Sequence, residues 1–177
     1  AIVLLAEDGH LDNLPWLRYV AARYGSYPNV WFCVCNEWNI KDPNYTADEI
    51  VRAGQTLREH LPHATTPVSV HGDFGPWHAE LNGEWCDHAI IQWKLKTIAE
   101  AADAAAESQR LAEGRPIVND ENAYQGEGDG FSEDDTIEGC FGTFLGGGYP
   151  TTGEKHGNKL GQYFWGGFDV RAHSAAD

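Results

Sequence analysis

Two short apolar stretches of this chain each end in a glutamate. Residues 29–35 run directly into Asn36 and Glu37, and residues 115–120 run into Glu121. Hydrolysis of a glycosidic bond needs such a pair of carboxyl groups, one as proton donor and one as nucleophile or base. Glu37 alone could equally be a strand-end carboxylate that reaches solvent or pairs with an arginine. The second glutamate in the same setting makes catalysis the favoured interpretation.

The composition of both stretches predicts β-strands that bring the two glutamates to one edge of a sheet. Residues 29–35 are mainly β-branched, aromatic and thiol side chains, and apolar residues occupy both faces. This pattern is typical of a strand that is buried on both sides in a parallel sheet. Ligands of parallel α/β folds bind at the carboxyl ends of the strands, which is where Glu37 and Glu121 stand.

Strands and helices are predicted to alternate along the chain. Further strands are expected at residues 1–5, 67–71, 88–92 and 149–153, and helices at about 13–24, 46–60, 95–112 and 132–145, with a short helix near 77–81. Polar side chains follow five of the strands: Glu37, His71, Gln92, Glu121 and Glu154. This alternation predicts an α/β fold with a parallel sheet. The polar side chains at the carboxyl ends of the strands are typical of a (β/α)8 TIM barrel, whose active site lies there.

Six strands are recognisable, so we expect a partial TIM barrel in which the first two βα units are missing. The chain starts at Ala1 with what looks like the middle of a strand, and it contains no methionine. We therefore expect residues 1–177 to form one amino-terminally truncated domain of a longer protein.

The charge and the cysteines argue against several classes of protein. The formal net charge of −15 disfavours binding to nucleic acid or to an anionic membrane surface, which both need a basic face. No apolar run approaches the roughly 20 residues of a membrane-spanning helix. The four cysteines have no zinc-ligand spacing and are expected to be buried free thiols. No metal or other cofactor is predicted.

The strand ends resemble those of the clan A retaining glycoside hydrolases. In that clan the fourth strand carries the acid/base after an asparagine, as in Asn36–Glu37, and the seventh carries the nucleophile, as in Pro116–Glu121. The amino-acid sequences of Tyr27–Glu37, Pro116–Glu121 and Gly147–Glu154 are most similar to those of the apiosidase-like barrels. The resemblance spans nearly the whole chain and makes residues 1–5 the third strand.

The resemblance implies a role for each residue that matches. Glu37 matches the general acid/base, Glu121 the nucleophile, and Asn36 the asparagine that bonds the 2-hydroxyl of the sugar at the cleavage point. Asp120 competes with Glu121, because it is adjacent and points to the other face of the strand. The family spacing from Pro116 favours Glu121. This sequence departs from the family in two ways: the first two strands are missing, and the connection after the strand at 67–71 is too short for a full helix. The resemblance therefore does not identify the substrate.

Further substrate contacts are predicted at or beyond the strand ends: His71, Gln92, Tyr124, Glu154, Trp38 and Trp165. Each has a structural alternative. His71 could be a hydrogen-bonded loop histidine, and Glu154 could form a salt bridge. The two tryptophans could stack on sugar rings or lie in the core. Tyr124 could donate a hydrogen bond to Glu121.

The leading hypothesis is a retaining O-glycosidase that acts on a plant- or microbe-derived glycan or glycoside by double displacement. Its carbohydrate substrate is the only partner predicted. For retention, the carboxyl groups of Glu37 and Glu121 should lie about 5–5.5 Å apart. The alternative is a non-catalytic carbohydrate-binding or scaffold protein on the same barrel. A metal-dependent hydrolase ranks third, since it would want several histidines at the strand ends.

Overall fold

The computed structural model describes residues 2–4, 14–40, 45–124, 131–151, 155–156 and 159–160, which form alternating strands and helices. In chain order the elements are β1 (Ile2–Leu4), α1 (Leu14–Tyr24), β2 (Trp31–Cys33), α2 (Ala47–His60), β3 (Val68–Ser69), β4 (His71–Phe74), the 3-10 helix η1 (Ala79–Leu81), β5 (Ala89–Gln92), α3 (Ile98–Leu111), β6 (Ile117–Asn119), α4 (Glu133–Leu145), β7 (Tyr149–Pro150), β8 (Lys155–His156) and β9 (Lys159–Leu160). None of the helices in these ranges is long and apolar enough to cross a membrane.

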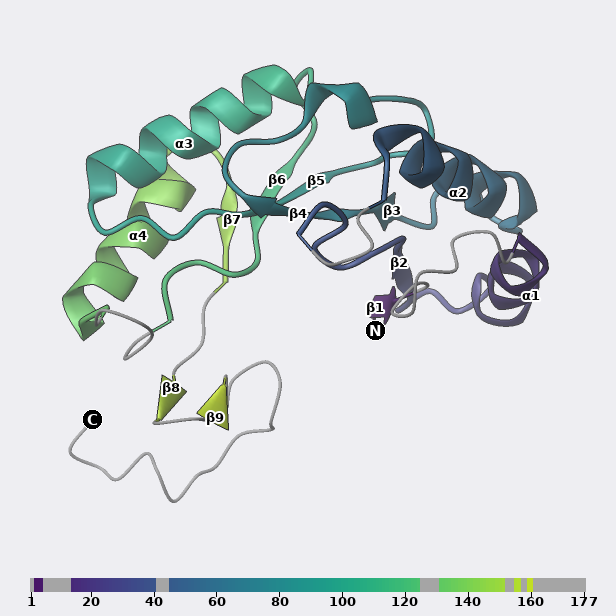
Figure 1. Cartoon of the computed structure of the whole chain (residues 1–177), viewed down its shortest axis with the longest axis horizontal. Helices are drawn as coiled ribbons and strands as arrows, with labels where there is room; N and C mark the ends of the chain where they lie inside the picture. Colours follow the sequence, from purple (N-terminus) through teal and green to yellow (C-terminus); the bar gives the residue numbers. More distant parts are fainter. Residues whose placement is uncertain are drawn as a thin grey trace.

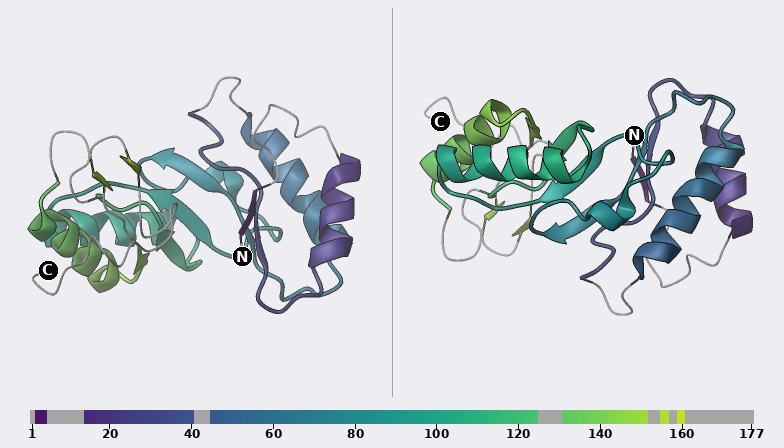
Figure 2. Two further views of the ribbon diagram at one scale, coloured as in Figure 1. Left: turned by 90° about the horizontal axis from the view of Figure 1, so that it is seen from below. Right: turned by 90° about the horizontal axis from the view of Figure 1, so that it is seen from above.

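The strands from β1 to β7 run parallel, and neighbours in the chain are neighbours in space. They form two groups, β1-β2-β3 and β4-β5-β6-β7. Backbone hydrogen bonds from His71 N to Cys35 O (3.0 Å) and from Trp38 N to His71 O (3.2 Å) connect the end of β2 to β4. Figure 1 shows the helices as an arc around the outside of the strands. In Figure 2, α1 and α2 lie at one end of the molecule and α3 and α4 at the other.

One expected strand is divided. Residues 67–71 were expected to form a single strand that ends in His71, but the structure breaks it at Val70 into β3 and β4. β3 pairs with β2 and β4 pairs with β5, so the chain changes its hydrogen-bonding partner between them. His71 is therefore the first residue of β4 and not the last residue of a strand, and this correction matters for the site below.

A second difference lies after β7. The sequence predicted a single strand over residues 149–153; β7 covers Tyr149–Pro150, and residues 152–153 lie outside the described residues. The sequence analysis did not predict β8 and β9, which pair antiparallel. The sequence Gly157–Asn158 between β8 and β9 is a two-residue hairpin signal that could have predicted this pair.

Helix starts follow the caps that the sequence carries. The Thr46 side chain accepts a hydrogen bond from Glu49 N, and the Glu49 carboxylate accepts one from Thr46 N, which is a capping box. Ser132 and Asp135 form the same arrangement at the start of α4. Such caps satisfy amide groups that the first helical turn leaves without partners, and they fix where each helix begins.

Residues at helical spacing on α1 and α2 bury one face of each helix against the strands. The core side chains that meet there are Leu17, Val20, Ile50, Leu57, Phe32, Val34 and Val68. Burying each of these apolar side chains contributes about 1.5–3 kcal/mol before the cost in chain entropy.

Glycines let α4 approach α3 closely. A Cβ on Gly142 would lie 2.3 Å from Ile98 O, and one on Gly146 would lie 2.3 Å from Ala102 O. Any side chain at these positions would push the helices apart, so glycine is required there by contact with the neighbouring backbone. The close packing holds the helix that follows β5 against the one that follows β6.

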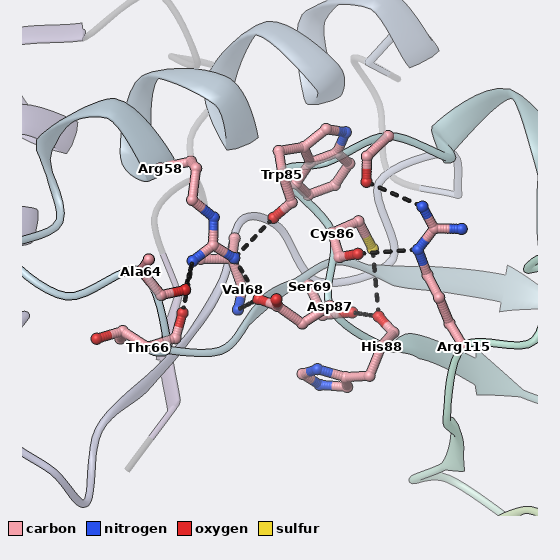
Figure 3. Close-up of polar contacts among 11 residues, drawn as sticks. Arg58, Ala64, Thr66, Val68, Ser69, Trp85, Cys86, Asp87, His88 and Arg115 are labelled. Atoms are coloured by element: carbon pink, nitrogen blue, oxygen red, sulfur yellow. Dashed lines mark hydrogen bonds and ion pairs between the residues drawn. The ribbon is translucent and has the colours of Figure 1, made fainter.

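Arginines from α2 and from the start of β6 hold the loops at the amino ends of the strands. Arg58 donates hydrogen bonds to the backbone oxygens of Ala64 (2.8 Å), Thr66 (3.0 Å) and Trp85 (3.2 Å), and to the carboxylate of Asp87. Arg115 donates to Cys86 O at 3.0 Å. Figure 3 shows Arg58 between the loop before β3, with Ala64 and Thr66, and the loop before β5, where Arg115 also binds. Carbonyl oxygens that would otherwise be without partners are satisfied by these side chains.

Candidate active site

Glu37 follows the continuation of β2 and has a left-handed backbone. Its φ angle is +49°, a conformation that costs a non-glycine residue roughly 1–2 kcal/mol. The chain turns there: Ile40 N bonds Glu37 O at 3.1 Å, while Trp38 N bonds back to β4. Glu37 is partly exposed. The turn therefore keeps the carboxylate at the carboxyl edge of the strands, where the sequence predicted it.

His71 connects the ends of two strands that are far apart in the chain. Its Nδ1 lies 2.5 Å from Asn36 Oδ1, next to Glu37, and its Nε2 lies 3.3 Å from Asp120 Oδ1, next to Glu121. The ring is 2% exposed. His71 is therefore the residue that brings the two predicted catalytic stretches to a common point.

The two carboxylates that end β6 have different surroundings. Gln92, itself 2% exposed, donates a 2.7 Å hydrogen bond from Nε2 to Glu121 Oε2. The pKa of Asp120 is raised well above its usual value, because burial penalises its charge and because the negative charge of Glu121 is adjacent. These surroundings favour the protonated form of Asp120.

Backbone contacts fix the turn that carries these carboxylates. Asn119 accepts a hydrogen bond from Trp93 N (3.1 Å) through Oδ1 and donates one to Trp93 O (2.9 Å) through Nδ2, which ties the end of β6 to the end of β5. Thr151 Oγ1 donates to Asp120 O at 2.7 Å from the neighbouring end of β7. No motif in the sequence marks these positioning residues beyond their place at strand ends.

Tyr124 is buried beneath a lysine that the sequence analysis did not single out. The Tyr124 ring is 2% exposed, and Lys94 Nζ lies 4.9 Å from its centroid and 5.1 Å from that of Phe74. Both are cation–π contacts. The predicted hydrogen bond from Tyr124 to Glu121 stays a prediction. A lysine two residues after Gln92 carries no motif, so only the structure reveals this contact.

The tryptophan after Glu37 lies in the core. Trp38 is 6% exposed, and its ring meets the His78 ring edge-on at 5.3 Å between centroids. Neighbouring side chains therefore cover the Trp38 ring, and in this structure it does not present the sugar-stacking surface that was predicted for it. His78 Nε2 also lies 2.9 Å from Asp73 Oδ1. Sequence reasoning missed this histidine, which lies in the glycine-rich connection after β4.

Two predicted contacts, Glu154 and Trp165, lie outside the described residues. Three others, His71, Gln92 and Tyr124, are in the structure but buried. Their position suits them to hold neighbouring groups in place more than to touch a ligand directly. No group of three or more metal-ligating side chains occurs among the described residues.

Several solved structures share this fold. They include a putative glycoside hydrolase from Bacteroides vulgatus (TM-score 0.72, 24% identity, covering 90% of this chain and 33% of that one). A glycoside hydrolase family 5 protein from the same species has a TM-score of 0.64 and 14% identity, covering 80% and 34%. The catalytic domain of the Thermobifida fusca endoglucanase Cel5A has a TM-score of 0.56 and 15% identity, covering 87% and 56%.

These likenesses confirm the predicted fold class, a part of a (β/α)8 barrel with parallel strands. The chain spans about a third of the length of the first two of these structures. No curated protein matches the sequence. Residues 11–142 match the catalytic domain of the apiosidase-like proteins, three quarters of the chain, as the strand-end residues predicted. The chain therefore belongs to the apiosidase-like catalytic domain family.

Proposed function

We propose that this chain carries the catalytic carboxylates of a retaining O-glycosidase that acts on a plant- or microbe-derived glycan or glycoside. The observation that supports it most is the contact of His71 with both Asn36 (2.5 Å) and Asp120 (3.3 Å). Each contacted residue directly precedes one of the two glutamates. The family and the fold point to the same class of reaction.

In the first step Glu37 donates its proton to the leaving oxygen, while Glu121 attacks the anomeric carbon. The bond from that carbon to the leaving oxygen breaks, and an ester to Glu121 forms. Gln92 holds Glu121 Oε2, so Oε1 is the oxygen that attacks. In the second step the Glu37 carboxylate removes a proton from water, and the water displaces Glu121 from the sugar. Asn36 binds the 2-hydroxyl of the sugar. The separation of about 5–5.5 Å between the two carboxyl groups stays a prediction.

Replacement of each glutamate separates the two roles. On 2,4-dinitrophenyl glycosides of xylose, arabinose, glucose and galactose, Glu121→Ala should release no sugar. Added azide should then give a glycosyl azide of inverted configuration. Glu37→Ala should still form the ester on these substrates, because a dinitrophenolate leaves without protonation, and azide should give the retained anomer.

Glu59→Ala is the control, since Glu59 is an exposed residue on α2. Equal loss in both glutamate variants, with no azide product from either, would contradict the assigned roles. Carbohydrate binding by the wild-type chain without turnover of any glycoside would instead favour the non-catalytic alternative.

A further inference from the structure

The contact between His71 and Asn36 determines where the histidine carries a hydrogen. Asn36 Oδ1 can only accept, and it lies 2.5 Å from His71 Nδ1. The ring must therefore be protonated at Nδ1. The amide end of Asn36, Nδ2, makes no hydrogen bond to the residues that the structure describes. The histidine thus holds the oxygen of Asn36 inward and leaves its NH2 group to a ligand.

The other ring nitrogen faces a carboxyl group. A neutral ring with its hydrogen on Nδ1 has a bare Nε2, which is an acceptor, and Asp120 Oδ1 lies 3.3 Å from it. Two acceptors at this distance repel each other unless a proton lies between them. One proton on Asp120 removes the repulsion, since Asp120 then donates to Nε2.

The buried setting favours a pair in which His71 and Asp120 are both neutral over a buried ion pair of the two. Thiols and carboxyl groups stand on β2 and β4 and shortly after β2 and β6: Cys33, Cys35, Glu37, Asp73 and Glu121. A cation nearby is Lys94, two residues after β5, which lies over the rings of Phe74 and Tyr124. Gln92, the polar residue at the end of β5, is neutral. A second full negative charge on Asp120 would lie beside Glu121 in a buried position, which is costly. Burial and Glu121 do raise the pKa of Asp120. Burial raises the pKa of the Cys33 thiol, so this thiol is neutral as well.

We propose that Asp120 is a protonated residue that donates to His71 Nε2, and that this proton fixes the side chain of Asn36 with its NH2 group toward the substrate. Asp120 and His71 are then positioning residues, and Glu121 is the only charged carboxylate of its turn. The proton arrangement stands on the geometry alone. The reference to the substrate rests on the proposed function.

The arrangement predicts a tautomer switch in His71. When high pH removes the proton from Asp120, the carboxylate becomes an acceptor, and the ring moves its hydrogen from Nδ1 to Nε2. Nδ1 then faces Asn36 Oδ1 without a hydrogen between them, so the amide of Asn36 must turn. In Asp120→Asn the amide Nδ2 donates to Nε2 at every pH, and the ring keeps its hydrogen on Nδ1.

Nitrogen NMR of the histidine rings in the 177-residue chain tests this proposal without any substrate. The His71 signals are identified by their absence in His71→Gln. At pH 7 we expect the Nδ1-protonated neutral ring in the wild type, and a switch to Nε2 as the pH is raised. Asp120→Asn should abolish the switch. Asp73→Asn, which alters a histidine–carboxyl contact at His78, should leave the switch unchanged.

A His71 ring protonated at Nε2 at pH 7 would overturn the proposal, and this result needs only the wild-type protein. A switch that persists in Asp120→Asn would overturn it too. If the protein cleaves a 2,4-dinitrophenyl glycoside, kcat/KM should fall through the pH range of the switch in the wild type and not in Asp120→Asn. The expected spectra from a protein that cleaves no glycoside would refute the proposed function and leave the proton arrangement intact.

Discussion

Gln92 Nε2 donates a 2.7 Å hydrogen bond to Glu121 Oε2 from the end of the neighbouring strand. Gln92 is buried, and its Oε1 has no hydrogen-bond partner among the described residues. Within the described residues, the hydrogen bond to Glu121 is therefore the main polar interaction of the Gln92 side chain. Because it comes from β5, it fixes the orientation of Glu121 relative to a strand other than its own.

Loss of this hydrogen bond should weaken catalysis more than stability. Removing a hydrogen bond to a charged group costs about 1.5–3 kcal/mol, so Gln92→Leu should lower kcat/KM on an aryl glycoside by about 10- to 100-fold. The melting temperature should change little, because leucine fills the same buried volume. Gln109→Leu, on α3, is the matched control and should leave both quantities unchanged. A fall in melting temperature with wild-type kcat/KM would contradict this role for Gln92.

The raised pKa of Asp120 predicts how stability depends on pH. In the unfolded chain this carboxyl ionises at about pH 3.9, whereas in the folded protein it keeps its proton to higher pH. The contribution of Asp120 to the free energy of unfolding is therefore complete below about pH 4. It is lost as the pH rises through the folded pKa, at up to about 1.4 kcal/mol per pH unit. Asp120→Asn cannot ionise and should gain stability relative to the wild type over this range. Urea unfolding between pH 4 and pH 8 measures the difference; a constant difference would refute the prediction.

Gly54 on α2 should not tolerate a methyl group. A Cβ there would lie 2.0 Å from Cε3 of Trp85, a buried and rigid ring. Overpacking of this kind costs about 1–3 kcal/mol and should exceed the gain of about 1 kcal/mol in helix propensity. Gly54→Ala should therefore lower the free energy of unfolding. At Gly72 a Cβ would meet its nearest neighbours at 3.7 Å, so Gly72→Ala is the control and should cost less. Equal stabilities would show that Trp85 can move.

Arg58 should stabilise the fold more than a surface arginine does. It donates to three backbone oxygens and to Asp87, and its side chain is mostly buried (Figure 3). Arg58→Ala should lower the free energy of unfolding by about 2–4 kcal/mol, since these acceptors lose their donors. Among the described residues Arg110 pairs only with Glu107, on the exposed face of α3, so Arg110→Ala should have no measurable effect. Denaturant unfolding of both variants tests this contrast, and similar losses in the two would contradict it.

Much of the fold could be predicted because each strand and helix carries a local signal. The caps at Thr46 and Ser132, and the apolar stretches that precede Glu37 and Glu121, placed these elements within a few residues. The break at Val70 could not be predicted, because it arises where the chain changes its pairing partner, which is a tertiary event.

The site, too, could be predicted only in part. Parallel strands end at one edge, so the sequence predicted that Asn36, Gln92 and Glu121 would gather there. That His71 contacts both Asn36 and Asp120 depends on side-chain directions that no pattern in the sequence records. The core position of Trp38 was also hidden, because a tryptophan after a strand suits a sugar platform and a buried core equally well.

The central claim is that Glu121 forms a covalent ester with the sugar. A 2,4-dinitrophenyl 2-deoxy-2-fluoro-glycoside, of the sugar that the protein cleaves fastest, should react once and leave the fluoro-sugar attached. Mass spectrometry of the proteolysed protein should then find the added mass on Glu121. The same mass on Asp120, or turnover of the parent glycoside without any labelled peptide, would contradict the claim.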